Sequence, residues 1–143
     1  MIVTTSRIGF VRENYLNMRA ASFNAAGMHG AALKEITKIE ALREGTIGRH
    51  LTRSNIWLDI VASSTLLGIG QFDEAVVRAK KAFIVSRDIN SVNNIANIVD
   101  IHGRLLRSPY KNESDVTELG DMLTETLAEL AKESEQHTTE EDY

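Results

Sequence analysis

Histidines and acidic residues are the side chains of this chain that could do acid–base or metal chemistry at neutral pH. The four histidines are His29, His50, His102 and His137. They lie far apart, and none forms a His-x-x-x-His or similar ligand pattern with an acid. His102 follows an apolar stripe and is interpreted as a packed histidine, and Glu35 and Glu40 as surface charges. Without cysteine to supply a thiol, the sequence predicts a protein that is not an enzyme and holds no metal or cofactor.

Asparagine is the residue type whose placement suggests a binding function. Asn17 and Asn24 are seven residues apart on a predicted helix, and Asn93 and Asn97 are four apart on another, so each pair shares a face. Asparagine disfavours helix interiors because its side chain competes for the backbone, yet its amide offers both a donor and an acceptor. Two interpretations stay open: these amides line a peptide groove, or they lie on a solvated face or bond within the chain.

The apolar spacing predicts six helices that position these side chains. They cover about residues 6–26, 31–43, 52–70, 72–87, 91–107 and 114–132. The single proline leaves long spans without a helix breaker, which favours an all-α fold. Short turns near Gly27, Gly70 and residues 108–112 predict three antiparallel hairpins.

A faint internal repeat relates the first two hairpins. Equivalent residues are 43 positions apart: Gly27 and Gly70, Ala32 and Ala75, Phe23 and Leu66, Ala20 and Ser63. Small residues at Ala75, Ala79 and Ala82 allow close approach of two helices, and Phe72 can plug the open end of the hairpin. Repetition of this kind is typical of helical arrays.

The second hairpin resembles a tetratricopeptide repeat (TPR). It carries the family's small, large, Gly-x-aromatic-x-x-Ala and small positions at Ser63, Leu66, Gly70, Phe72, Ala75 and Ala82. The first hairpin matches in part, with His29 at the aromatic position, and the third does not match. The chain is most similar to the divergent TPR-like halves of bacterial cytoplasmic transcription regulators. No DNA-binding helix-turn-helix is visible, so we predict no direct nucleic-acid binding.

The resemblance implies a cytoplasmic regulatory or sensor domain that binds an extended peptide or partner segment in a concave groove. The first helix of each hairpin would line this groove. Carried over to this chain, the amides of Asn17 and Asn24 would clamp the peptide backbone, with Asn93 and Asn97 on the fifth helix. Trp57 would be an apolar anchor of the kind that dominates interfaces, or alternatively a core residue.

Charge and length predict one domain, residues 1–132, followed by an acidic tail. Residues 1–110 hold fourteen basic and nine acidic side chains, whereas residues 111–143 hold two and eleven. Residues 133–143 lack an apolar stripe and are expected to be disordered. No apolar run is long enough to span a membrane.

The sixth helix carries an apolar stripe that can be buried in two ways. The stripe comprises Val116, Leu119, Leu123, Leu127 and Leu130. It either caps the array by packing on the fifth helix or forms the seam of a homodimer. In the second case the chain would be a structural dimerisation or adaptor module.

Overall fold

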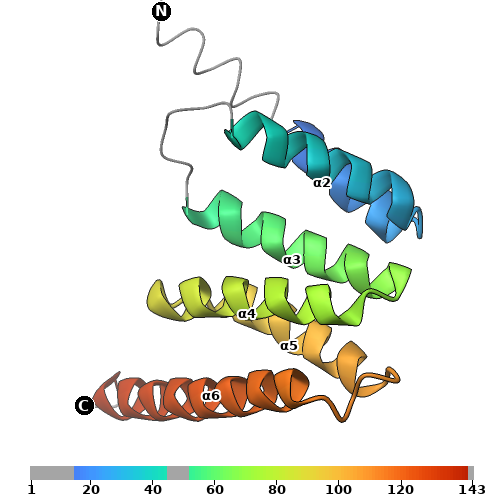
Figure 1. The fold of residues 1–143 in the computed structure, drawn as a ribbon. Coiled ribbons are helices and arrows are strands. Elements are labelled where there is room, and N and C mark those ends of the chain that lie inside the picture. Colours follow the sequence, from blue (N-terminus) through green and yellow to red (C-terminus); the bar gives the residue numbers. More distant parts are fainter. Residues whose placement is uncertain (1–14, 45–51, 142–143) are drawn as a thin grey trace, which may run out of the picture.

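The chain is all-α throughout the part that the computed structural model describes, residues 15–44 and 52–141. A first helical segment covers residues 15–25. It is followed by α2 (His29–Glu44), α3 (Thr52–Ile69), α4 (Phe72–Asp88), α5 (Val92–Leu106) and α6 (Ser114–Glu141). Figure 1 shows α2, α3, α4 and α6 stacked in chain order from the top of the view to the bottom, with α5 behind α4. The predicted all-α fold of six helices is confirmed for these residues.

Three turns between consecutive helices share one geometry. Gly27, Gly70 and Asn90 have positive φ angles of 78°, 90° and 55°. The N–H of each bonds the carbonyl three residues earlier at 3.1 Å, and the following N–H bonds the carbonyl five residues back from itself. These two bonds make the Schellman ending, which favours glycine or asparagine because they tolerate left-handed backbone. These helices therefore end at the positions where the sequence predicts turns.

The α3–α4 hairpin is the centre of the array. Ala75, Ala79 and Ala82 of α4 are fully buried, and Ser63 of α3 donates its hydroxyl to the Ala75 carbonyl at 2.7 Å. A hydroxyl this close to a neighbouring helix backbone requires small residues at the crossing. Phe72 packs on the core and stacks with Tyr110, their ring centroids 6.2 Å apart.

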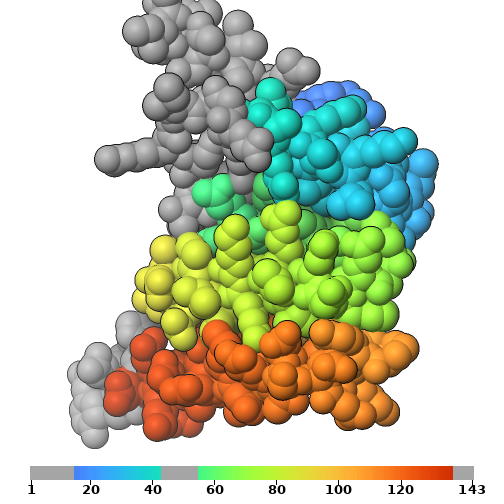
Figure 2. Space-filling model, viewed as in Figure 1, coloured from blue at the N-terminus to red at the C-terminus, as the bar shows by residue number. Residues whose placement is uncertain are grey.

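Two apolar clusters hold the helices together, and α3 contributes to both. The larger joins α3, α4, α5 and α6 around side chains such as Phe83 and Ile98, which are fully buried. The smaller joins residues 15–25, α2 and α3, and includes Leu16, Ile36 and Leu58. Figure 2 shows α4 filling the surface between α2 and α6.

Helix α6 caps the array and runs beyond the expected boundary. Val116, Leu119 and Leu123 are buried in the larger cluster, while Leu127 is 44% exposed. The stripe that would form a dimer seam is therefore largely covered within the chain. The helix continues to Glu141, so residues 133–141 are helical and differ from the predicted disordered tail. Five of these nine residues are glutamate or glutamine, which favour helix formation.

Candidate binding face

The five predicted site residues differ widely in their availability to a ligand. Asn17 is only 7% exposed, and Asn24 and Trp57 are half-buried. Asn93 and Asn97, on α5, are exposed. Only the α5 pair therefore has its amides open to solvent as the peptide-groove interpretation requires.

The Asn24 amide belongs to a series of hydrogen-bonded side chains that runs from one helix of the array to the next. Its Nδ2 donates to Ser64 Oγ of α3 at 2.9 Å, and its Oδ1 accepts a bond from His29 Nδ1 at 2.9 Å. The same Ser64 oxygen accepts a bond from Nη1 of Arg104, on α5, at 2.8 Å. Four side chains thus link α2 to the first helices of all three hairpins. For Asn24, the interpretation of hydrogen bonding within the chain is the one that the structure supports.

These contacts correct the register inferred from the turns. Aligning the turns, 43 residues apart, places Asn24 opposite Leu67. In the structure Asn24 meets Ser64, and Ser64 meets Arg104, each 40 positions away. The two spacings differ by three residues, which is nearly one helical turn. They differ because helices that lie side by side are shifted along their axes.

A second row of residues follows from the same forty-residue spacing. Asn17, Trp57 and Asn97 are each seven residues before a member of the first row. Seven residues are two helical turns, or about 10 Å along the axis, and keep a side chain on the same face. Three of the five predicted residues therefore belong to one row. Asn93 lies a further turn along α5 from Asn97.

Trp57 is anchored in the smaller apolar cluster rather than fully displayed. It is half-buried and packs against the cluster formed by residues 15–25, α2 and α3. The core interpretation is thus correct for part of its ring.

Within residues 15–44 and 52–141, two buried polar atoms of the first hairpin have no hydrogen-bond partner. They are Asn17 Oδ1 and Glu35 Oε2. The other Glu35 oxygen lies 3.4 Å from both Arg19 and Lys38. Glu35 is 3% exposed, so its interpretation as a surface charge was wrong. The periodicity could not reveal this burial, because the covering residues come from another helix.

The outward side of α5 carries two parallel stripes. Val92, Val99 and Leu106 are 58%, 37% and 49% exposed, and Ala96 and Gly103 lie between them at alternating spacings of four and three. The residues that follow each member of this apolar stripe in the sequence form a polar stripe with the same spacings. It comprises Asn93, Asn97, Asp100, Arg104 and Arg107. Through Arg104 the polar stripe borders α3, so amides and apolar side chains lie next to each other on this face.

Two histidines pack against helical glycines and not against acids. A Cβ added at Gly68 would collide with the His29 ring, and one added at Gly120 would lie 2.8 Å from His102 Nε2. His102 Nε2 also donates to the Val116 carbonyl at 3.2 Å. The interpretation of His102 as a packed histidine is confirmed, and both rings lock neighbouring helices together.

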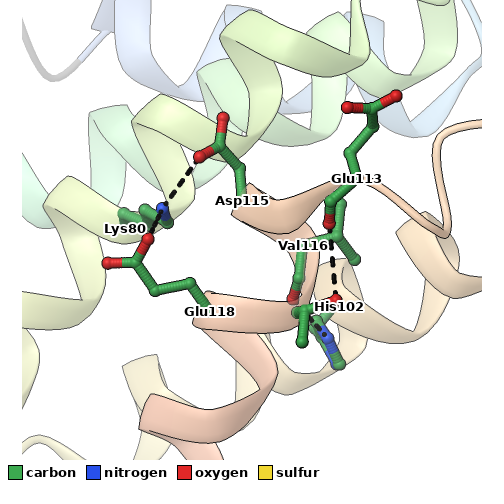
Figure 3. A network of polar contacts seen from close by, with 7 residues as sticks. Lys80, His102, Glu113, Asp115, Val116 and Glu118 are labelled. Atoms are coloured by element: carbon green, nitrogen blue, oxygen red, sulfur yellow. Dashed lines mark hydrogen bonds and ion pairs between the residues drawn. The ribbon is translucent and has the colours of Figure 1, made fainter.

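Ion pairs fasten α4 to its neighbours. Figure 3 shows Lys80 of α4 directed at two acids of α6, with Nζ 2.9 Å from Glu118 and 3.4 Å from Asp115. Burial by itself would lower the pKa of Lys80, but the hydrogen bond to Glu118 and the attraction of both acids outweigh it and raise the pKa.

Arg78 likewise pairs with two acids, on the other side of α4. It bonds Asp59 of α3 at 2.9 Å and Glu40 of α2. Burial favours a lower pKa for Arg78, but its hydrogen bonds to the two acids raise the pKa. Together with Lys80, this arginine ties α4 to three other helices.

Arg104 is the residue of this face that sequence reasoning missed. The sequence held a signal for it, since polar side chains recur at positions 24, 64 and 104. The turn-based alignment concealed it.

Among the described residues, no group of three or more histidines and acids could hold a metal ion. Within the same residues, no helix has the length and apolarity to cross a membrane.

Comparison with known proteins adds no relative to this description. No protein-family model matches the chain. No curated protein and no solved structure matches it either.

Proposed function

We propose that this chain is a non-enzymatic, TPR-like interaction module that binds an extended peptide or partner segment. The binding face is formed by residues 15–25, α3 and α5. The observation that carries the proposal is the row of Asn24, Ser64 and Arg104, whose hydrogen bonds join these three helices. The same forty-residue spacing relates Asn17, Trp57 and Asn97, which we take as a second row of the face.

The α5 part of this face has the chemistry that an extended peptide needs. A peptide presents backbone N–H and C=O groups alternating with side chains. The exposed amides of Asn93 and Asn97 can bond the backbone groups, since each amide supplies a donor and an acceptor. The neighbouring Val92, Val99 and Leu106 can take up apolar side chains. The half-buried Trp57 supplies a rigid anchor on α3.

The regulatory part of the proposal rests on the resemblance to TPR-like regions of bacterial regulators. In that setting the module would act in the cytoplasm and respond to a peptide or a partner protein. The apolar stripe of α6 is not open to a second copy of the chain as a homodimer seam requires, because Val116, Leu119 and Leu123 are buried against the chain's own core.

A peptide selection with matched variants tests the proposal. The purified chain is used to select from a displayed library of random peptides, and the affinities of selected peptides are measured by calorimetry. Replacing both Asn93 and Asn97 by alanine should weaken binding about tenfold or more, since each lost amide contact is worth about 1 kcal/mol. Asn112→Ala, an exposed asparagine outside the face, is the control and should change nothing.

Stability measurements separate binding effects from folding effects. The Asn93 and Asn97 side chains are exposed, so their removal should change the free energy of unfolding by less than about 0.5 kcal/mol. Asn24→Ala should cost about 1–2 kcal/mol, because this amide bonds both His29 and Ser64. A library that yields no peptide, or peptides that bind the double variant with undiminished affinity, would refute the proposed function.

A further inference from the structure

The helical segment 15–25 has one covered side and one bare side. Leu16 and Ala20 are buried against α2 and α3. The opposite side carries exposed residues at alternating spacings of three and four, which we call the N-terminal stripe: Tyr15, Met18, Ser22 and Ala25. Tyr15 is 57% exposed and Met18 is 69% exposed. The stripe holds no charged residue, whereas a helix face open to water usually carries charged and polar side chains.

The forty-residue spacing of the hairpins shows what such a stripe contacts inside the array. Leu58 of α3 and Ile98 of α5 are the equivalents of Met18, and both are buried. Ala62 is the equivalent of Ser22 and is also buried. Leu58 and Ala62 belong to the smaller apolar cluster, so on α3 this side is covered by the preceding hairpin. The N-terminal stripe is therefore a helix-packing face, and the described residues supply no hairpin that covers it.

The two ends of the array differ in the polarity of their outer faces. Figure 1 places segment 15–25 and α2 at one end and α6 at the other. The outer side of α6 is charged, since Asp121, Glu125 and Lys132 are exposed there. Such a polar face is what keeps the end of a helical array soluble. An N-terminal stripe docked on α6 of another copy would bury these charges without partners, which disfavours an open, head-to-tail row of copies.

The N-terminal stripe is complementary to a second copy of itself. Its spacings of three, four and three residues read the same in both directions. Two antiparallel copies therefore place Tyr15 opposite Ala25 of the other copy. They likewise place Met18 opposite Ser22. Each large side chain meets a small one, which lets the two helices approach and pack without voids.

Charge does not oppose this pairing. Arg19 is the one charged residue of segment 15–25, and it lies next to Met18 in the sequence. Its Nη2 is 3.4 Å from Oε1 of Glu35, so its charge is paired within the chain. A second copy therefore brings no unpaired charge from this segment to the contact.

From these observations we infer that the N-terminal stripe is the seam of a symmetric homodimer. In this dimer Tyr15 and Met18 of each copy pack against the small residues of the other. The partner is a second copy of this chain, joined through the same face on both sides, which closes the assembly at two. The inference is independent of the proposed function, because Asn24 bonds α3 from another side of the segment.

Light scattering of the full chain over a concentration series tests the dimer. The wild type should pass from monomer to dimer as the concentration rises. Met18→Glu should raise the dissociation constant at least about tenfold, because its charge enters the seam twice and finds no partner there. Val77→Glu is the matched control, since it makes the same kind of change at a 61% exposed residue of α4 and should leave the dissociation constant unchanged.

Circular dichroism separates association from folding. Both variants should keep the helical signal of the wild type, because both side chains are mostly exposed. A wild type that stays monomeric up to about 1 mM would overturn the inference. Equal dissociation constants for Met18→Glu and Val77→Glu would overturn it too.

An exchange of sizes tests the antiparallel pairing. Met18→Ser alone leaves a gap opposite Ser22, and Ser22→Met alone crowds the seam, so each should weaken the dimer about tenfold. The double variant restores a large residue opposite a small one, and its dissociation constant should return to within about threefold of the wild type. A double variant as weak as either single variant would overturn this pairing.

Discussion

Replacing Gly120 by alanine should destabilise this protein, although glycine to alanine inside a helix is normally stabilising. Gly120 lies in the seventh position of α6, well inside the helix. An added Cβ would lie 2.8 Å from His102 Nε2 and 2.9 Å from Cε1. Either the ring rotates away and loses its bond to the Val116 carbonyl, or α6 moves outward and opens the packing around Val116.

The magnitude follows from two opposing contributions. Alanine in a helix interior gains about 0.5–1 kcal/mol over glycine. Overpacking costs about 1–3 kcal/mol, and loss of the His102 hydrogen bond about 0.5–1.5 kcal/mol. The net loss in the free energy of unfolding should be about 1–2 kcal/mol. Gly103→Ala is the matched control, because its nearest contact is 3.6 Å away, and it should gain about 0.5–1 kcal/mol.

Urea unfolding gives the free energy of unfolding of both variants. A double-mutant cycle isolates the contact between position 120 and His102. With a slope of about 2 kcal/mol/M, Gly120→Ala should lower the midpoint by about 0.5–1 M at unchanged slope. In a His102→Ala background the clash is gone, so Gly120→Ala should become stabilising, with a coupling of about 2 kcal/mol. The reasoning is refuted if Gly120→Ala raises the midpoint as Gly103→Ala does, or if its effect is the same in both backgrounds.

Two further predictions concern the ion pairs of α4. Arg78→Met should cost about 2–3 kcal/mol in urea unfolding, because it removes the arginine partner of the Asp59 carboxylate, which is 10% exposed; a change below about 0.5 kcal/mol would contradict this. For Lys80, whose pKa is raised above 10.5, the contribution is complete below that value and disappears as the pH rises through the raised pKa. The stability difference between wild type and Lys80→Gln should therefore be about 0.5 kcal/mol at pH ~8 and disappear as the pH rises through the raised pKa, and a constant difference would exclude this ion pair as its source.

The helices and their pairing were predictable because they depend on short stretches of sequence. Gly27 and Gly70 signal turns, since each position needs left-handed backbone, and the structure ends helices there. The small residues of α4 predict close packing on α3, and they are fully buried. The full length of α6 was not predicted, because residues 133–141 lack the apolar stripe by which the other helices were recognised.

The candidate face was less predictable because it depends on contacts between distant residues. Asn17 and Asn24 share a helical face, which is correct, but one is buried and the other is hydrogen-bonded to α3. Asn93 and Asn97 follow the same kind of pattern and are exposed. Nothing in the spacing of these asparagines distinguishes the two cases.

The sequence by itself determined the helices, their order and their antiparallel pairing, because apolar period, turn residues and small residues act over a few neighbouring positions. Only the tertiary structure decided which polar side chains remain available to a partner. An offset of 40 rather than 43 residues between adjacent hairpins brings Asn24, Ser64 and Arg104 together. Such an offset is set by how whole helices pack along their axes, and no local pattern encodes it.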